Sequence, residues 1–228
     1  MNAPDLPVTM FVPPEYEPVR HEQLIELIRA HPLALLVTAT ESGPYATHLP
    51  VVLADDAGRT ADGPDTLTLL GHLNRANPHF AALARDVPSL LVFAGPGGYV
   101  SPRIYRTTPA APTWNFASVH ARGPVRVLDQ GAATRQVVAA TARLLEARFG
   151  RQWDATGSYD YFERLLPGVG AFMMTATDVR GMFKLSQEKD NAVRDRVAAA
   201  FGEDGNAELA ALMARCPVAH PPTGEARQ

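Results

Sequence analysis

The chain has 228 residues, a formal net charge of −3, and the 46% hydrophobic and 20% charged content of an ordinary globular protein. The negative charge argues against a nucleic-acid partner, because such proteins carry a basic face. The single cysteine, Cys216, excludes an internal disulfide and a thiolate metal cluster. No apolar run approaches the length of about 18 residues that a membrane span needs, and no signal sequence is visible, so a cytoplasmic protein is expected.

Short apolar runs between turn residues predict strands in the first half of the chain. Leu33 to Thr40 is rich in branched residues, and Glu41–Pro44 is typical of a hairpin turn. The strands expected here cover 33–40, 45–54, 66–72, 88–94 and 116–128, the last bent at Gly123–Pro124. An exposed loop is expected at 55–65, a turn at 95–98 and irregular chain at 99–112.

Apolar residues at helical spacing dominate the second half. Helices are expected at 21–30, 79–85, 132–149, 159–166, 191–201 and 207–215, with closing strands at 169–177 and 179–185. No repeat or linker is visible, so one domain over 10–215 is predicted, with flexible ends at 1–9 and 216–228. Hairpin-connected strands with inserted and appended helices predict an α+β fold built on an antiparallel β-barrel.

The segment from Pro112 to Gly123 carries an unusual set of side chains for a strand. It holds Trp114, Asn115, His120 and Arg122 within twelve residues. A pocket for a flat ligand with polar edges has a use for all four.

A second polar segment runs from Leu70 to Pro78. Gly71 lets a ligand approach the backbone, and Arg75 precedes a helix start at which Asn77 is the expected cap. A cation beside free helix amides favours a phosphate or carboxylate. The alternative is a surface arginine next to a plain helix cap.

Three histidines, His48, His72 and His120, fall within predicted strands. A single histidine of this kind is more often a hydrogen-bonded core residue, but three raise the odds that one faces a cofactor. A neutral imidazole ligates haem iron or hydrogen-bonds a flavin ring. A three-histidine zinc site is a further alternative without support from short spacing.

Two further segments carry candidate polar groups. Tyr99, Arg103 and Tyr105 lie in the irregular segment, where the alternative is an ordinary solvated loop. Lys184 lies near the end of the last predicted strand and is one of only two lysines, so a carboxylate partner is considered for it. Capping of the next helix by Ser186 and Gln187 is the alternative there.

Taken together and in order, these motifs resemble the PaiB-type proteins, a family labelled FMN-binding negative transcriptional regulators. The resemblance rests on Phe11–Pro13, Thr47–Pro50, Gly71–Pro78, Tyr99–Pro102, Pro112–Phe116 and Phe183–Gln187, and it spans residues 10–200. It implies a split β-barrel of the flavin-binding type and a homodimer with ligand sites at the subunit interface. No helix–turn–helix pattern or basic stripe accompanies the regulator label.

Within this family the chain more closely resembles the piperazate synthases, at Tyr105–Pro109, Leu166–Phe172 and Met182–Glu188. That branch uses haem b in place of FMN. The resemblance implies an enzyme that cyclises N5-hydroxy-L-ornithine to L-piperazic acid, forming a nitrogen–nitrogen bond with loss of water.

The resemblance also implies roles for the candidate residues. His72 is the first choice of axial iron ligand, with His48 and His120 as the other candidates. The groups considered for haem propionates or the substrate carboxylate are Arg75, Arg103 and Lys184. Trp114 is expected to stack on the macrocycle. Hydrogen bonds to the hydroxylamine or the α-amine are expected from Tyr99, Tyr105 and Asn115, and His120 or a tyrosine is considered as general acid.

FMN uses much the same residue types. Its phosphate would take Arg75 and the helix start at Asn77, and its ring would take an aromatic or apolar wall. The alternatives therefore stay open as an FMN-binding oxidoreductase and a flavin- or haem-sensing transcriptional regulator.

Overall fold

The structure is a computed structural model of the chain, and it describes residues 9–54, 66–84, 88–128, 131–151 and 153–216. The chain forms two compact units, which are described separately. The barrel unit comprises Ile28–Phe93 and His120–Val179, and the terminal unit comprises Met1–Leu27, Ala94–Val119 and Arg180–Gln228. The expected loop at 55–65 and most of the two expected flexible ends lie outside the described residues.

In the described part of the chain, the strands form one sheet in the order β6-β7-β3-β2-β1-β4-β5-β8. Their bounds are β1 Leu33–Thr40, β2 Gly43–Leu53, β3 Leu67–Asn74, β4 Ser89–Val100, β5 Thr113–Gly123, β6 Val125–Val127, β7 Val169–Ala176 and β8 Asp178–Lys184. The pairs β1–β2, β1–β4, β2–β3, β3–β7 and β6–β7 are antiparallel. With its flanking helices, this sheet confirms the expected α+β class.

The helices also follow the predicted pattern closely. Their bounds are α1 His21–Ala30, α2 Pro78–Leu83, α3 Pro102–Tyr105, α4 Ala132–Phe149, α5 Tyr159–Leu165, α6 Asn191–Glu203 and α7 Ala207–Arg215. Asn77 caps α2 by accepting a hydrogen bond from the His79 amide at 3.0 Å, with Pro78 at the first helical position, as predicted. Among the described residues, no helix is long and apolar enough to cross a membrane.

Two local expectations were wrong. The turn expected at 95–98 lies inside β4, because the glycines there serve close packing and not chain reversal. A Cβ added to Gly95 would lie 2.9 Å from Leu27 Cδ1 and 3.0 Å from the Ala117 carbonyl oxygen. In the segment expected to be irregular, β4 runs on to Val100 and α3 follows.

The alternative considered for Ser186 and Gln187, capping of α6, is also not what the structure shows. Asp190, and not Ser186 or Gln187, caps this helix by accepting a hydrogen bond from Val193 N at 2.7 Å. Ser186 instead has a positive φ of 61° in the turn after β8, a backbone conformation that non-glycine residues rarely adopt.

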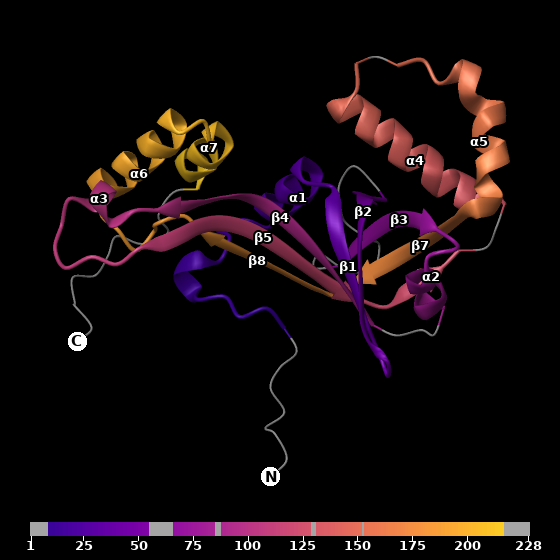
Figure 1. Cartoon of the computed structure of the whole chain (residues 1–228), viewed down its shortest axis with the longest axis horizontal. Helices are drawn as coiled ribbons and strands as arrows, with labels where there is room; N and C mark the ends of the chain where they lie inside the picture. The colour runs from indigo at the N-terminus through magenta and orange to yellow at the C-terminus, as the bar shows by residue number, and fades with distance from the viewer. Residues whose placement is uncertain (1–8, 55–65, 85–87, 129–130, 152, 217–228) are drawn as a thin grey trace, which may run out of the picture. The chain divides into compact units, whose positions relative to one another are not determined.

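In the barrel unit, alternation along the strands gives the sheet a buried and a half-exposed face. The fully buried face carries Leu36, Val51, Leu69, Phe172 and Met174. The other face carries partly exposed residues on neighbouring strands, namely Leu35, Val37, Leu70, Leu90, Val92 and Met173. Figure 1 shows α4 lying along β3 and β7, against which it packs.

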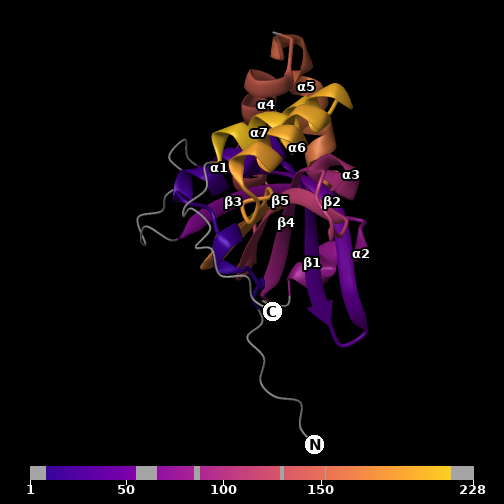
Figure 2. The same ribbon diagram turned by 90° about the vertical axis from the view of Figure 1, so that its left-hand side faces the viewer.

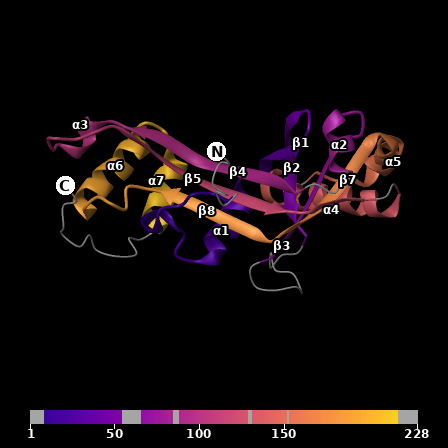
Figure 3. The same ribbon diagram turned by 90° about the horizontal axis from the view of Figure 1, so that it is seen from below.

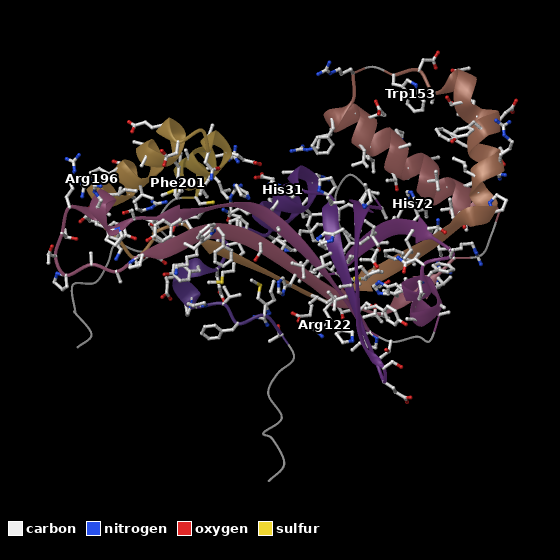
Figure 4. All side chains as sticks on the ribbon, viewed as in Figure 1. His31, His72, Arg122, Trp153, Arg196 and Phe201 are labelled. Carbon is white, nitrogen blue, oxygen red and sulfur yellow. The ribbon has the colours of Figure 1, made fainter. Side chains whose placement is uncertain are left out.

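In the terminal unit, β4, β5 and β8 run side by side (Figures 1 and 3) and α6 packs on α7 (Figure 2). Phe201 of α6, labelled in Figure 4, lies against Gly98 of β4, where an added Cβ would be 2.5 Å from its ring. Arg196 of the same helix donates to the carbonyl oxygens of Ile104 and Tyr105 at 3.2 and 2.9 Å. These contacts hold α3 next to α6.

Close packing at the junction of β5 and β6 is predicted to require glycine at position 123. A Cβ at this position would lie 2.0 Å from the Thr175 carbonyl oxygen, so a backbone must move. We expect Gly123→Ala to lower the free energy of unfolding by about 1–3 kcal/mol in chemical denaturation. The matched control is Gly202→Ala in α6, where nothing lies within 4 Å of the added Cβ. That change should raise stability by about 0.5–1 kcal/mol, and equal effects of the two substitutions would contradict the packing account.

Candidate functional site

His72 lies on β3, on the half-exposed face of the barrel unit, and Figure 4 labels it near α4. Its Nδ1 is buried and has no hydrogen-bond partner among the described residues. Burial lowers the pKa of the imidazole, which therefore stays neutral at neutral pH. A neutral imidazole with an unsatisfied nitrogen is the form that ligates a metal.

The other two strand histidines have different surroundings. His48 is exposed on β2, and His120 is half-buried on β5. The pKa of His120 is lowered first by burial and then by the neighbouring Arg122 guanidinium. Among the described residues, no group of three or more His, Cys, Asp or Glu side chains could hold a metal ion, so the zinc alternative has no support.

The segment from Arg75 to α2 is more internally bonded than the sequence suggests. The Arg75 guanidinium lies 5.0 Å from the centroid of the Phe80 ring. Asn77 accepts hydrogen bonds from the first amides of α2, from His79 N through its side-chain oxygen and from Phe80 N through its carbonyl oxygen. An anion at this point would therefore depend on the Arg75 cation and not on the helix amides.

His79, which the sequence did not single out as functional, organises the same segment. It is fully buried, its Nδ1 lies 2.8 Å from Thr47 Oγ1, and its Nε2 lies 2.9 Å from Thr38 Oγ1. Thr38 in turn bonds Ser89 at 2.7 Å, and the Tyr45 ring stacks on the imidazole at 5.5 Å. This network ties α2 to β1 and β2, and its only sequence signal is the histidine beside a helix cap.

In the terminal unit, Tyr99 and Trp114 form an exposed aromatic pair. Their rings are 6.2 Å apart and tilted by 57°, and the residues are 55% and 53% exposed. Arg103 lies on α3 and is also exposed. Exposed aromatic surface of this kind is available for stacking on a flat ligand.

Asn115 is fully buried and engaged by protein groups. Its Nδ2 donates to Ser186 Oγ at 3.0 Å and to Met213 Sδ at 3.6 Å, and its Oδ1 accepts from Ser186 Oγ at 3.1 Å. This pairing links β5 to the turn after β8 and accounts for the position of Ser186.

Lys184 belongs to a set of polar side chains that we name the lysine cluster. The cluster comprises Tyr16, Tyr105, Thr113, Lys184, Glu188 and Lys189. Lys184 Nζ donates to Thr113 Oγ1 at 2.7 Å and lies 5.7 Å from the centroid of the Tyr16 ring. The Tyr16 hydroxyl donates to Glu188 Oε2 at 3.3 Å, and Lys189 Nζ lies 3.9 Å from Glu188 Oε1.

Tyr105 completes the lysine cluster. It is only 3% exposed, its ring lies 5.0 Å from Lys189 Nζ, and its buried hydroxyl has no hydrogen-bond partner among the described residues. Burial first, and then the Glu188 carboxylate, raises the pKa of Tyr105, and the same causes raise the pKa of Tyr16. Both phenols therefore keep their protons at neutral pH.

The predicted residues are divided between the two units. His48, His72, Arg75, Asn77 and His120 belong to the barrel unit. Tyr99, Arg103, Tyr105, Trp114, Asn115 and Lys184 belong to the terminal unit. Sequence reasoning missed Tyr16, Glu188 and Lys189, although the scarcity of lysine pointed to the last.

A family model described as "Putative FMN-binding domain" matches residues 10–178 of the chain. The chain belongs to this FMN-binding family. It is 24% identical over 182 residues to the protease synthase and sporulation protein PAI 2 of Bacillus subtilis, covering 79% of this chain and 84% of that protein. It is 28% identical over 214 residues to the uncharacterized protein AN0679 of Emericella nidulans, covering 78% and 84% of the two chains. The predicted PaiB-type relationship is confirmed.

Solved structures of similar shape confirm the split-barrel fold. The FAD and heme binding protein of Mycobacterium smegmatis superposes with a TM-score of 0.55 at 19% identity, covering 81% of this chain and 80% of that one. The flavocytochrome Anf3 of Azotobacter vinelandii gives a TM-score of 0.51 at 17% identity, covering 72% and 67%. At these identities the likeness shows the fold alone.

The buried His79 network predicts a pH-dependent contribution to stability. Because burial lowers the folded-state pKa of His79, its contribution is complete above the unfolded-state pKa of about 6.5 and is lost as pH falls below it. We expect His79→Gln to lower the free energy of unfolding by about 2 kcal/mol at pH 8, with a smaller difference from wild type near pH 5.5. Denaturant titrations at both pH values measure this, with the exposed His48→Gln as control. A deficit that grows on acidification would contradict a neutral, buried His79.

Proposed function

We propose that this member of the FMN-binding family is a haem b-dependent piperazate synthase, which cyclises N5-hydroxy-L-ornithine to L-piperazic acid. Family membership supports a planar cofactor, and the motifs at Tyr105–Pro109, Leu166–Phe172 and Met182–Glu188 favour the haem-using branch. The observation that carries the choice of cofactor is the neutral imidazole of His72, whose buried Nδ1 has no hydrogen-bond partner among the described residues.

The residues near His72 fit a haem. Leu70 lies on the same half-exposed face of β3, and Met173 is its partner on β7, so the imidazole is flanked by apolar side chains. His72 would ligate the iron, and the Arg75 cation is a candidate for a propionate. Haem iron, when bound, would supply a Lewis acid that polarises the N–O bond of the hydroxylamine.

The side chains of the protein would bind the substrate and assist the proton transfers of the reaction. Ring closure forms the bond between the two nitrogens, breaks the N–O bond, takes one proton from the α-amine and releases water, so no oxidant or reductant is needed. Lys184 can hold the substrate carboxylate by a charge-assisted hydrogen bond. Tyr105, whose phenol keeps its proton, can donate a hydrogen bond to the bound substrate.

The proposed assembly is a homodimer with the ligand site at the subunit interface. The half-exposed apolar face of the barrel unit supports it, since Leu35, Leu90, Val92 and Met173 are only partly covered within one chain.

An FMN-binding oxidoreductase is the second candidate. The family description favours it directly, and Arg75 suits a flavin phosphate as well as a propionate. A transcriptional regulator is less favoured, because the net charge of −3 gives no electrostatic attraction to DNA.

The absorption spectrum of the purified protein tests the cofactor. We expect a Soret band, and we expect His72→Ala to weaken haem binding by more than about 10-fold in a titration. His48→Ala, which removes an exposed imidazole, is the matched control and should leave the titration unchanged. Paired flavin bands in place of a Soret band would support the oxidoreductase, and an unchanged spectrum of the His72 variant would remove it as ligand.

Incubation with N5-hydroxy-L-ornithine tests the reaction itself. We expect mass spectrometry to detect a product lighter than the substrate by one water, with the properties of L-piperazic acid. A haem-loaded protein that leaves the substrate unchanged would overturn the assigned activity while leaving the cofactor in place.

A further inference from the structure

The lysine cluster gathers charged and phenolic side chains from distant segments of the chain. Both lysines of the 228-residue chain belong to it, together with the Glu188 carboxylate and two phenols. Its members come from segments far apart in sequence, since the Tyr16–Glu188 hydrogen bond joins positions 172 residues apart. Chance surface pairs along one helix would not give this arrangement.

The cluster has unused hydrogen-bonding capacity. A lysine ammonium has three donors, and Lys184 directs one of them to Thr113. Lys189 lies 3.9 Å from Glu188, beyond the length of a good charge-assisted hydrogen bond. Among the described residues, the buried Tyr105 hydroxyl has no hydrogen-bond partner, which costs free energy unless a ligand or water satisfies it.

We propose that the lysine cluster binds the head of a free α-amino acid: Lys184 and Lys189 take its carboxylate, Glu188 takes its α-amino group, and Tyr105 hydrogen-bonds to the bound head. This inference rests on the proposed function, because N5-hydroxy-L-ornithine is such an amino acid, and it extends that function to Tyr16, Glu188 and Lys189.

Charge complementarity supports this class of ligand. The two ammonium groups of the cluster suit a carboxylate, while Glu188 offers an acceptor for an amine. A carboxylate accepts from the α-amino group in both its ammonium and its neutral form, so Glu188 can hold the amine before and after it becomes a nucleophile. Tyr16 orients Glu188 through its hydroxyl and is a positioning residue.

Three ligands that cannot be cyclised separate the roles of the charges. L-ornithine carries both groups of the head, putrescine lacks the carboxylate, and 5-aminopentanoate lacks the α-amine. Calorimetry on the full-length protein, in the cofactor state in which it is purified, measures each affinity. We expect L-ornithine to bind at least about 10-fold more tightly than either truncated ligand, since each lost contact is a hydrogen bond to a charged group. Equal affinities for all three, or no binding of L-ornithine, would overturn the proposal.

Two substitutions then assign the groups. Glu188→Gln should abolish the preference for L-ornithine over 5-aminopentanoate, and Lys184→Met should abolish the preference over putrescine. Glu203→Gln, an exposed acid at the end of α6, is the control and should preserve both preferences. Circular dichroism checks that each variant is folded. Retention of the full preference for L-ornithine by the folded Glu188 variant would refute its role.

The outcome is independent of the test of the proposed function. Ornithine discrimination by a protein that lacks a Soret band would refute the haem cyclase and leave the amino-acid site standing. Formation of piperazic acid together with unchanged discrimination in the Glu188 and Lys184 variants would refute the site alone.

Discussion

Pairing of β3 with strands on both of its edges is the constraint on which the barrel unit depends. Hydrogen bonding to β2 and β7 directs Leu69 and Gly71 into the core and leaves Leu70 and His72 on the half-exposed face. A slip of one residue would exchange the two sets. It would bring an imidazole to the position of Gly71, where even a Cβ would lie 2.5 Å from the Phe172 ring. The position of the candidate iron ligand is therefore enforced by packing.

The two histidines of this region show how surroundings decide chemical role. His79 has hydroxyl partners at both ring nitrogens and a tyrosine stacked on its face. Both nitrogens are therefore engaged in contacts that attach α2 to the sheet. His72 is also neutral because of burial, but its Nδ1 is unsatisfied among the described residues. A buried polar atom without a partner is costly, and such atoms concentrate where a ligand or catalytic task compensates.

Desolvation plays the corresponding part in the terminal unit. Tyr16 and Tyr105 sit beside the Glu188 carboxylate, and burial together with that negative charge favours their protonated forms. The two lysines keep the surroundings from becoming net negative. The result is a set of proton donors held against one acceptor, a suitable environment for a zwitterionic ligand.

Local signals explain which elements were predicted to the residue. α1 ends before Pro32, α4 ends before Gly150, and Asn206 caps α7 by accepting from Leu209 N at 3.3 Å. These signals act within a few residues, so they are readable in one sequence. The turn predicted at 95–98 was wrong because Gly95 is needed for close packing against Leu27 and Ala117, which are distant in sequence.

The same distinction applies to function. The sequence by itself determined the family and the alternation that places Leu70 and His72 on one face of β3. It also indicated Lys184 as a candidate binding residue, because lysine is scarce in this chain. Motifs and periodicity are properties of neighbouring residues, so they can be read from one sequence. Only the tertiary structure decided that Asn115 is committed to Ser186, that His79 and not His72 carries the buried network, and that Tyr16 meets Glu188. Such partnerships join residues from distant segments, and a hydrogen bond or a desolvated charge depends on which groups are actually brought together in space.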